Sequence, residues 1–411
     1  MQLKPGYKQT ELGVIPQEWE CARISTVAVL ESGHTPSKRE PSYWNGSIPW
    51  VSLFDTQGLQ GCEIFETAKM ITEEGLNNSS ARLLPKGTVV FSRTATVGKT
   101  TVMGREMATS QDFANYICGP KLHNHYLVYL FRNMGRTWKS LMAGSIHNTI
   151  YMPVFKALQI VLPPLPEQRA IATALSDVDE LLGGLDRLIA KKRDLKQAAM
   201  QQLLTGQTRL PGFNGKWEIK TLRSIVQTPV TDGPHLTPQF LDDGIPFLSV
   251  NNLVENKIDL KELRFISRAD HELFSRKCRP LKNDILLGKA ASVGKVALVN
   301  LEIEFNIWSP IAMIRTNREN APSFVYFQLQ SADLIRQITL LTNSSSQGNI
   351  GMGDIEKLAL KLPPVSEQEA IAEVLTDMDA ELAALEQRRE KTRSVKQGMM
   401  QELLTGRTRL V

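Results

Sequence analysis

Cysteine is scarce in this chain of 411 residues, and the few cysteines follow no recognisable pattern. They are scattered and include no C-x-x-C pair: Cys21, Cys62, Cys118 and Cys278. Small secreted domains use closely spaced cysteines as a disulfide framework, and zinc sites use paired ones. The sequence therefore argues against both, and we expect the chain to work in a reducing cytoplasm.

Long apolar stretches are also missing. No run of apolar residues reaches the roughly 18 that a membrane-spanning helix needs. Residues 1–13 lack the apolar core of a signal peptide, so we expect no membrane association. The length allows two or three hydrophobic cores. The 42% hydrophobic and 22% charged residues are typical of a globular protein.

Catalytic signatures are the third absence. Gly-Lys-Thr at 98–100 looks like the end of a phosphate-binding loop, but Arg93 stands where that loop requires its first glycine. His-Asn-His at 123–125 has no partners at metal-ligand spacing, so we expect a surface turn there. Neither H-E-x-x-H nor G-x-S-x-G occurs. These absences favour a binding protein without a catalytic or metal site, and the net charge of +5 is compatible with a nucleic-acid ligand.

What the sequence does contain is a long repeat. Residues 162–210 and 362–410 align without a gap, and about half of the positions are identical. Both copies open on Leu-Pro-Pro and approach their end with Leu-Leu-Thr-Gly, which are start and stop signals for a helix of roughly 38 residues. Pro166 suits a first helical position in the first copy, and Ser366 and Glu369 have the spacing of a capping box in the second.

Apolar residues inside both copies recur at intervals of four and three, which is typical of a coiled-coil seam. The seam positions are Ile171, Leu175, Val178, Leu182 and Leu185, and then Ile371, Leu375, Met378, Leu382 and Leu385. We predict that the two helices pack on each other; the alternative is that each packs only on its own globular domain. The region between the copies starts near 210 and ends near 362, and the ends of a compact domain lie close together. The helices should therefore be antiparallel, with one globular domain at each end.

The two globular regions are related as well, although more loosely. Ile-Pro-Trp-Val-Ser at 48–52 corresponds to Ile-Pro-Phe-Leu-Ser at 245–249. Short apolar runs at 89–91 and 285–287 predict buried strands, and each is followed by a turn that ends in Val-Gly-Lys. With helices expected in both halves, the pattern predicts an α+β fold with an internal pseudo-two-fold repeat. The expected plan is a globular domain at 1–162, a helix at 163–206, a second globular domain at 207–362 and a second helix at 363–411.

This plan and its motifs resemble the specificity subunit of type I restriction–modification enzymes. The resemblance rests on Leu-Pro-Pro-Leu-Pro-Glu-Gln-Arg-Ala-Ile-Ala at the first helix, on the repeated Leu-Leu-Thr-Gly, and on Ser-Arg-Thr-Ala-Thr-Val-Gly-Lys at 92–99. It covers the whole chain. It implies two target-recognition domains that each read one half of a split double-stranded DNA sequence, and an antiparallel coiled coil that sets the spacing. It also implies two docked modification subunits, and restriction subunits in the full complex. S-adenosylmethionine, ATP and Mg²⁺ would be bound by those partners, and this chain would hold no cofactor.

For such a role the sequence offers basic and polar residues in turns. Cations contact phosphates, whereas side chains that donate and accept hydrogen bonds read base edges. The candidate phosphate ligands are Lys38, Arg39, Arg93, Lys99, Lys289 and Lys295. The candidate base readers are His34, Thr35, Tyr43, Ser145, His147 and Asn148 in the first domain, and His235, Thr237, Gln239, Ser345, Gln347 and Asn349 in the second. The unequal turns of the two halves are what an asymmetric split target would require.

Two other functions stay open from the residues alone. A non-catalytic scaffold or adaptor would bind proteins only, and it would not shift DNA. A nuclease or methyltransferase acting alone would turn over DNA when given Mg²⁺ or S-adenosylmethionine without a partner.

Overall fold

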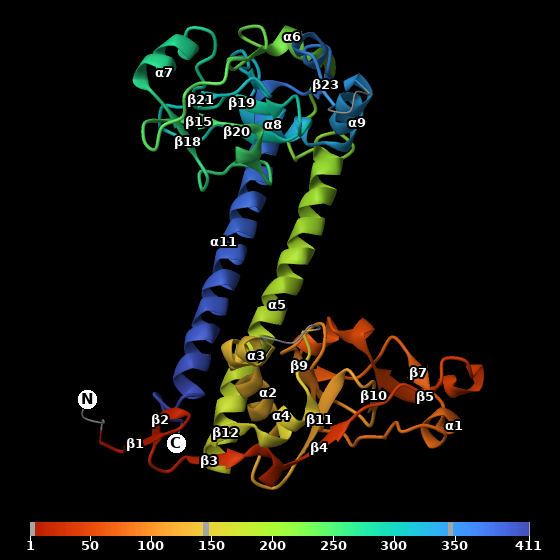
Figure 1. Ribbon diagram of the computed structural model, residues 1–411. Helices are drawn as coiled ribbons and strands as arrows, with labels where there is room; N and C mark the ends of the chain where they lie inside the picture. Colours follow the sequence, from red (N-terminus) through yellow and green to blue (C-terminus); the bar gives the residue numbers. More distant parts are fainter. Residues whose placement is uncertain (1–4, 143–147, 344–347, 411) are drawn as a thin grey trace. The chain divides into compact units, whose positions relative to one another are not determined.

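The computed structural model describes residues 5–142, 148–343 and 348–410 (Figure 1). The chain divides into two compact units. One unit is Met1–Arg187 together with Gln387–Val411, and the other is Leu188–Glu386. Each unit therefore holds one globular domain, the start of one long helix and the end of the other.

The globular domain of the first unit is built on two β-sheets. The larger sheet has the strand order β4-β11-β8-β9-β6, the smaller one has the order β10-β5-β7, and β1·β2 and β12·β3 form separate pairs. The strands are β1 (Tyr7–Thr10), β2 (Gly13–Pro16), β3 (Glu20–Arg23), β4 (Ala28–Ser32), β5 (Trp44–Val51), β6 (Glu63–Ile64), β7 (Met70–Ile71), β8 (Val89–Ser92), β9 (Thr100–Met103), β10 (Ala108–Thr109), β11 (Phe113–Cys118) and β12 (Gln159–Leu162). The helices are α1 (Glu73–Asn77), α2 (Asn124–Asn133), α3 (Gly135–Met142) and α4 (Met152–Ala157), with short 3₁₀ turns η1 (Ile24–Thr26), η2 (Pro41–Tyr43), η3 (Leu53–Asp55) and η4 (Gly58–Gln60).

The core of this domain is aromatic. Phe91 on β8 lies 5.4 Å from Phe131 on α2, 4.7 Å from Trp138 on α3 and 5.3 Å from Phe155 on α4, measured between ring centroids. All four rings are buried. Aromatic pairs at such separations add to the stability gained by burial, so these rings hold the three helices against the larger sheet. The run predicted as a buried strand at 89–91 is confirmed as part of β8.

The globular domain of the second unit has a related set of sheets. Their orders are β14-β22-β19-β20 and β18-β15-β21, with the pairs β13·β23 and β16·β17. The strands are β13 (Glu218–Thr221), β14 (Thr231–Asp232), β15 (Ile245–Leu248), β16 (Leu253–Val254), β17 (Lys257–Ile258), β18 (Arg264–Ile266), β19 (Ile285–Gly288), β20 (Val296–Leu298), β21 (Asn306–Ile307), β22 (Ile311–Ile314) and β23 (Ala359–Leu362). The helices are α6 (Leu222–Ile225), α7 (Arg268–Ser275), α8 (Pro322–Leu329), α9 (Ala332–Leu341) and α10 (Met352–Ile355), with the 3₁₀ turn η5 (Val250–Asn252).

The two domains share strand directions as well as strand order. In the first, β10 runs parallel to β5 and β5 antiparallel to β7. In the second, β21 runs parallel to β15 and β15 antiparallel to β18. The central strands β11 and β22 each pair antiparallel with two neighbours, β4 and β8 or β14 and β19. The internal repeat predicted from the sequence therefore extends to the order and direction of most strands in the two main sheets, whereas β6 is an additional edge strand of the first domain.

The two long helices are α5 (Leu165–Leu203) and α11 (Val365–Leu403). Near the start of α5, the amide of Gln168 donates to the carbonyl oxygen of Pro163 at 2.8 Å, and Gln368 donates to Pro363 at 2.9 Å near the start of α11. Because α11 already begins at 365, Ser366 lies inside the helix, and the predicted capping box is wrong. The predicted C-terminal glycines are confirmed by φ values of +73° at Gly206 and +70° at Gly406.

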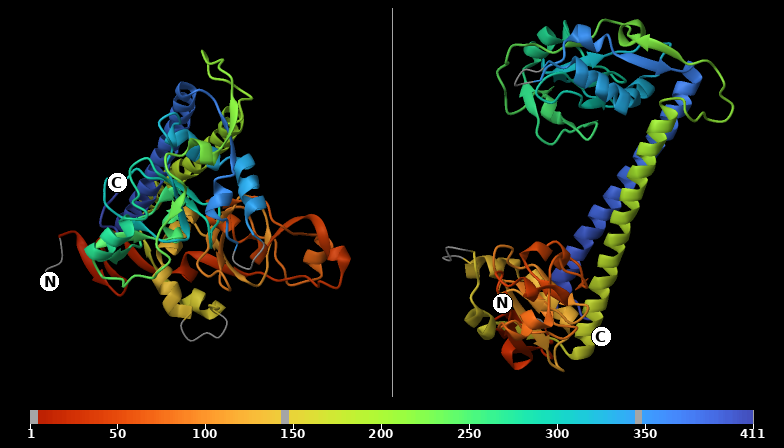
Figure 2. Two further views of the ribbon diagram at one scale, coloured as in Figure 1. Left: turned by 90° about the horizontal axis from the view of Figure 1, so that it is seen from above. Right: turned by 90° about the vertical axis from the view of Figure 1, so that its right-hand side faces the viewer.

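Each unit pairs the two helices side by side and antiparallel (Figures 1 and 2). Ion pairs between the helices show the direction, because the residue numbers rise along one helix as they fall along the other. In the first unit the pairs are Asp179–Lys396 at 2.6 Å and Asp186–Arg389 at 3.3 Å. In the second unit they are Lys192–Glu381 at 2.7 Å and Lys196–Asp379 at 2.5 Å. The predicted antiparallel pairing is thus found within each unit.

The predicted seam has a broader role than helix–helix contact. Ile171 and Leu175 lie in the core of the first domain together with the end of α11 at 403–404. Their counterparts Ile371 and Leu375 lie in the second core with the end of α5 at 203–204. Leu185 and Leu382 are buried, whereas Val178, Leu182, Met378 and Leu385 are half-buried. The spacing correctly marks the buried face, but the globular domain covers part of that face.

The two repeated motifs meet at a junction in each unit. Glu167, at the start of α5, accepts hydrogen bonds from the guanidinium of Arg409 at 2.6 and 2.9 Å and from the indole of Trp19 at 2.9 Å. Glu367 accepts two bonds from Arg209 in the same way, at 2.5 and 2.6 Å. The Glu-Gln opening of one copy is therefore paired with the Thr-Arg-Leu ending of the other copy.

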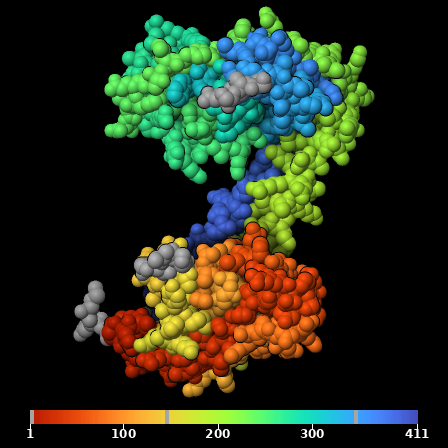
Figure 3. Space-filling model, turned by 45° about the vertical axis from the view of Figure 1, so that its right-hand side comes forward, coloured from red at the N-terminus to blue at the C-terminus, as the bar shows by residue number. Residues whose placement is uncertain are grey.

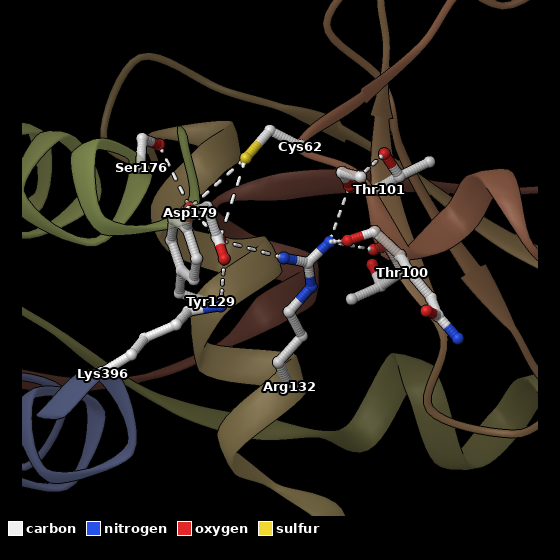
Figure 4. Close-up of polar contacts among 10 residues, drawn as sticks. Cys62, Thr100, Thr101, Tyr129, Arg132, Ser176, Asp179 and Lys396 are labelled. Atoms are coloured by element: carbon white, nitrogen blue, oxygen red, sulfur yellow. Dashed lines mark hydrogen bonds and ion pairs between the residues drawn. The ribbon is translucent and has the colours of Figure 1, made fainter. Parts of the chain in front are cut away.

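A polar network in the first unit joins the domain to both helices (Figure 4). Asp179 accepts a hydrogen bond from the hydroxyl of Tyr129 at 2.9 Å and pairs with Lys396 at 2.6 Å and Arg132 at 3.7 Å. Arg132 also donates to the carbonyl oxygens of residues 60, 61 and 100. Burial, followed by the contact with Cys62 and the charge of Asp179, raises the pKa of Tyr129, so its hydroxyl stays protonated and donates.

Candidate nucleic-acid interface

Four loops of the first domain leave the same end of its two sheets. β4 and β8 both pair antiparallel with β11, so both end where β11 begins. β10 and β5 pair in parallel, and residues 110–112 join β10 directly to β11. The loops after β4, β5, β8 and β10 therefore gather at one end. In Figure 3 the red and orange segments, which contain these loops, make up much of the visible surface of this unit. Loops positioned by a rigid scaffold commonly carry binding residues.

Side-chain bonds fasten these loops to one another. The hydroxyl of Thr35 donates to the side-chain oxygen of Gln111 at 2.6 Å. The Nε of Arg93 donates to the backbone oxygen of Gln111 at 2.9 Å. The ammonium of Lys99 donates to the backbone oxygen of Thr56 at 3.2 Å. The two bonds to Gln111 thus link the loops after β4, β8 and β10. The bond from Lys99 links the loop after β8 to the loop after β5.

The second domain gathers the equivalent loops, which follow β14, β15, β19 and β21. Asp232, fully buried at the end of β14, pairs with Lys277 at 2.5 Å, Lys289 at 3.2 Å and His235 at 3.4 Å. Burial raises the pKa of this carboxyl, but the hydrogen bonds and charges of Lys277 and Lys289 outweigh it and hold the pKa below its usual value. An ionised Asp232 therefore joins the loops after β14 and β19 of this cluster to the segment after α7.

Both clusters contain the same turn, at 92–99 and 288–295. In each the last glycine donates to the carbonyl oxygen of the first residue, at 3.2 Å in the first domain and 2.9 Å in the second. Gly98 and Gly294 have φ values of +96° and +89°, and Ala95 and Ala291 have +52° and +61°. A non-glycine residue at positive φ is strained by about 1 kcal/mol or more, and such strain gathers at binding sites. The motif shared by the two sequences is thus one rigid turn, in which the alanine at positive φ is exposed and the other residues are buried or half-buried.

A model of the family described as Type I restriction modification DNA specificity domain matches residues 16–190 and 214–393. The chain belongs to this family. It is 25% identical to the MjaIX specificity subunit of Methanocaldococcus jannaschii over 87% of this chain and 86% of that protein. It is 24% identical to the EcoKI specificity subunit of Escherichia coli (strain K12) over 87% of this chain and 82% of that protein.

Solved structures of specificity subunits share the fold of the chain. The crystal structure of a type I restriction–modification S subunit from M. genitalium aligns with a TM-score of 0.60 at 15% identity, over 98% of both chains. A chain from a structural study of the assembly and conformational transition of a type I system aligns with a TM-score of 0.58 at 17% identity, over 96% of this chain and 99% of that one. The α+β fold with two repeated domains and two long helices is therefore that of a specificity subunit.

The chain is thus a DNA specificity subunit of a type I restriction–modification system, with two recognition domains and no catalytic role. This identification sets aside both the adaptor and the enzyme acting alone. Across the residues that the structure describes, no helix is both long and apolar enough to cross a membrane. Over the same residues, no group of three or more His, Cys, Asp or Glu side chains is placed to hold a metal ion.

The specificity subunit places most of its predicted first-domain residues on or beside the loop cluster. His34, Lys38, Arg39 and Asn148 are exposed, and Thr35, Tyr43, Arg93 and Lys99 are half-buried. Arg93 also donates to the carbonyl oxygen of Ile150 at 3.2 Å, so part of its hydrogen-bonding capacity holds the loop together. Ser145 and His147 lie outside the described residues.

The second domain places several of its predicted residues at the surface and one of them in the interior. His235, Thr237, Gln239 and Asn349 are exposed, and Lys295 is half-buried. Lys289 is only 9% exposed, and its ammonium is paired with the buried Asp232. Lys289 thus neutralises the Asp232 carboxylate, which would be costly to leave unpaired in the interior, and its phosphate contact stays a prediction. Ser345 and Gln347 lie outside the described residues.

Two loops of the cluster were missed by the sequence reasoning. One is residues 110–112, whose Gln111 connects Thr35 to Arg93. The other is the turn after β5, at 52–57, and its counterpart at 249–252. A signal for the second was available, because both turns directly follow the repeated Ile-Pro run that ends in serine. No comparable repeat marks residues 110–112.

Proposed function

We propose that the loop cluster of each domain binds one half of a split double-stranded DNA target. The observation that carries the proposal is that both clusters rest on the same strand order and the same 92–99 and 288–295 turns, while their surrounding side chains differ. A shared scaffold gives both domains the same approach to the duplex. Different loop side chains suit two different half-sites.

Within each cluster the side chains divide by chemistry. Lys99 and Lys295 end the same rigid turn, and a lysine at such a place suits a phosphate, which carries no sequence information. Asn148 and Asn349 are exposed amides held beside the turn by the bonds from Ile150 and Ile350 to residues 93 and 289. An amide of this kind can donate to and accept from adenine in the major groove.

The helix pair is the proposed docking surface for two modification subunits, with restriction subunits joining the full complex. Because α5 and α11 repeat one sequence, two copies of one partner can dock in equivalent ways. In this proposal the helices also fix the number of unread bases between the half-sites. S-adenosylmethionine, ATP and Mg²⁺ are bound by the partners, and the complex works in the cytoplasm.

The test is to purify the chain together with its modification subunits, incubate the complex with plasmid DNA and S-adenosylmethionine, and sequence the methylated adenines. We expect two short sequences separated by unread bases. The chain without its partners should give no methylation. A continuous target sequence, or methylation by the chain alone, would contradict the proposal.

A further inference from the structure

One aromatic side chain of the first-domain cluster is unusually exposed. Phe54, in the turn η3 after β5, is 73% exposed. Its backbone is fixed, because Asp55 accepts bonds from the backbone N–H of Ser52 at 2.8 Å and from its hydroxyl at 3.0 Å. The other oxygen of Asp55 accepts from the N–H of Ala68 at 2.6 Å. A large apolar ring is therefore held out into solvent on a turn that is clamped from two sides.

One lysine lies beside this ring, and a second is bonded to the same turn. The ammonium of Lys69 is 4.9 Å from the centroid of Phe54 and 5.8 Å from that of Trp44. The bond from Ala68 to Asp55 fixes this arrangement, because it joins the neighbour of Lys69 to the neighbour of Phe54. A second lysine, Lys99, is bonded to the same turn through the carbonyl oxygen of Thr56, two residues after Phe54. An exposed ring with one cation beside it and another bonded to its turn is suited to a polyanion that has flat apolar groups, which is the chemistry of a nucleic acid.

The second domain holds a different side chain at the same place. Its turn η5 has the same capping box, made by Ser249 and Asn252. This alignment sets Asn251 at the position of Phe54. The pairing of β15 with β18 sets Arg264 at the position of Lys69. Asn251 and Arg264 line a cavity of about 380 Å³, and the guanidinium of Arg264 lies 4.9 Å from the centroid of the half-buried Phe240.

We infer that Phe54 is a base-contacting residue of the first domain, which stacks on a base or wedges into a base step of its half-site. The inference rests on the proposed function. Partial unstacking of a base step is unfavourable, and protein contacts to the phosphates on either side can offset that cost. Lys69 and Lys99 are placed to make those contacts. The first half-site is thus read partly through the deformability of one step.

The position equivalent to Phe54 in the second domain reads its half-site with an amide. The two domains therefore differ in the kind of readout at this place as well as in the bases that they prefer. The exchanges Phe54→Asn and Asn251→Phe test whether one position accounts for this difference.

The test uses the complex of the full chain with its modification subunits and a duplex carrying the target defined by adenine methylation. 2-Aminopurine replaces each adenine of the first half-site in turn, except the methylated adenine, which the modification subunits can extrude. We expect the wild-type complex to raise the fluorescence at one step, because stacking there is lost. Phe54→Ala and Phe54→Asn should abolish that rise and lower target affinity roughly 10- to 100-fold, with a smaller loss on unrelated DNA. Phe54→Tyr should keep the rise.

Phe65→Ala is the matched control, because Phe65 is also exposed, at 53%, but packs against Gly104 at the opposite end of β9 from the 92–99 turn. A wild-type complex that methylates no split target would overturn the proposed function itself. A wild-type complex that methylates a split target while Phe54→Ala behaves like Phe65→Ala would overturn this inference alone. Loss of subunit assembly with unchanged DNA binding by the assembled Phe54→Ala fraction would also overturn it, because Phe54 would then face a protein.

Discussion

Lys289 and Lys295 flank one turn of the second domain, yet the structure gives them different surroundings. Lys289 is buried against Asp232, whereas Lys295 is half-buried and ends the turn. In the first domain Arg93 stands in the place of Lys289, and Lys99 in that of Lys295. The sequence shows that Lys289 is basic, but it does not show which carboxylate from a distant segment forms an ion pair with it in the interior. That carboxylate, Asp232, is 57 residues before Lys289 and belongs to no motif.

At this scale we predict that Lys99→Ala and Lys295→Ala weaken binding to all DNA sequences alike. Each removes one phosphate contact, so the slope of log affinity against log salt should fall by about 1. Fluorescence anisotropy of the complex with target and unrelated duplexes at several salt concentrations measures both quantities. Lys289→Met is the matched comparison, because it should destabilise the second domain, and an unchanged salt slope would mean that Lys289 contacts no phosphate. A loss confined to one base position would argue against the phosphate role of Lys99 or Lys295.

At the scale of elements, the long helices are the part of the fold that the sequence predicts best. Prolines before the helices and glycines after them act locally, so the predicted span of roughly 38 residues agrees with the 39 residues of α5 and of α11. The element that covers the apolar face of each helix was predicted less well. Ile171 and Leu175 pack against a domain core as well as against the other helix. Periodicity identifies a buried face but does not name the element that covers it.

The junction between the repeated motifs was also beyond sequence reasoning. Glu167 and Arg409 are 242 residues apart, and only the antiparallel pairing of the helices within the first unit brings them together. The same holds for Asp179 and Lys396, which are 217 residues apart. Such pairs follow from the topology, so they can be assigned only after the direction of the helices is known.

We predict that Arg409→Ala destabilises the first unit by about 2–3 kcal/mol, because it leaves the carboxylate of Glu167 buried with only the indole of Trp19 as a partner. This value is smaller than the usual cost of breaking a fully buried ion pair. The Arg409 side chain is 22% exposed, so water partly screens its charge. Urea denaturation with hydrogen exchange localises the loss. The double variant Glu167→Leu with Arg409→Met should recover much of it.

Arg407→Ala is the matched control for this measurement. Arg407 pairs with Glu402 at 3.4 Å, and both side chains are exposed, so its loss should cost less than about 1 kcal/mol. Equal effects of Arg407→Ala and Arg409→Ala would mean that the buried junction contributes nothing beyond a surface ion pair.

At the scale of the whole molecule, each recognition domain is an insertion between two paired strands. β3 enters and β12 leaves the first domain side by side, and the N–H of Ile24 donates to the carbonyl oxygen of Leu158 at 2.9 Å. In the second domain β13 and β23 pair in the same way, and Leu222 donates to Leu358 at 2.8 Å. The helix residues beneath each domain are of the same types, with isoleucine at 171 and 371 and leucine at 175 and 375. The two domains are therefore joined to the helices through equivalent strand pairs and equivalent helix residues.

The most direct test of two independent readers uses this equivalence within the chain itself. Residues 24–158 are replaced by a second copy of residues 222–358, and the complex with modification subunits is assayed by sequencing the adenines that it methylates. The account predicts that the half-site of the second domain appears twice, in inverted orientation, with the wild-type number of unread bases between the copies. The original first half-site should disappear. A correctly folded chimaera that still methylates the original split target, or that alters both half-sites and the spacing together, would contradict the account.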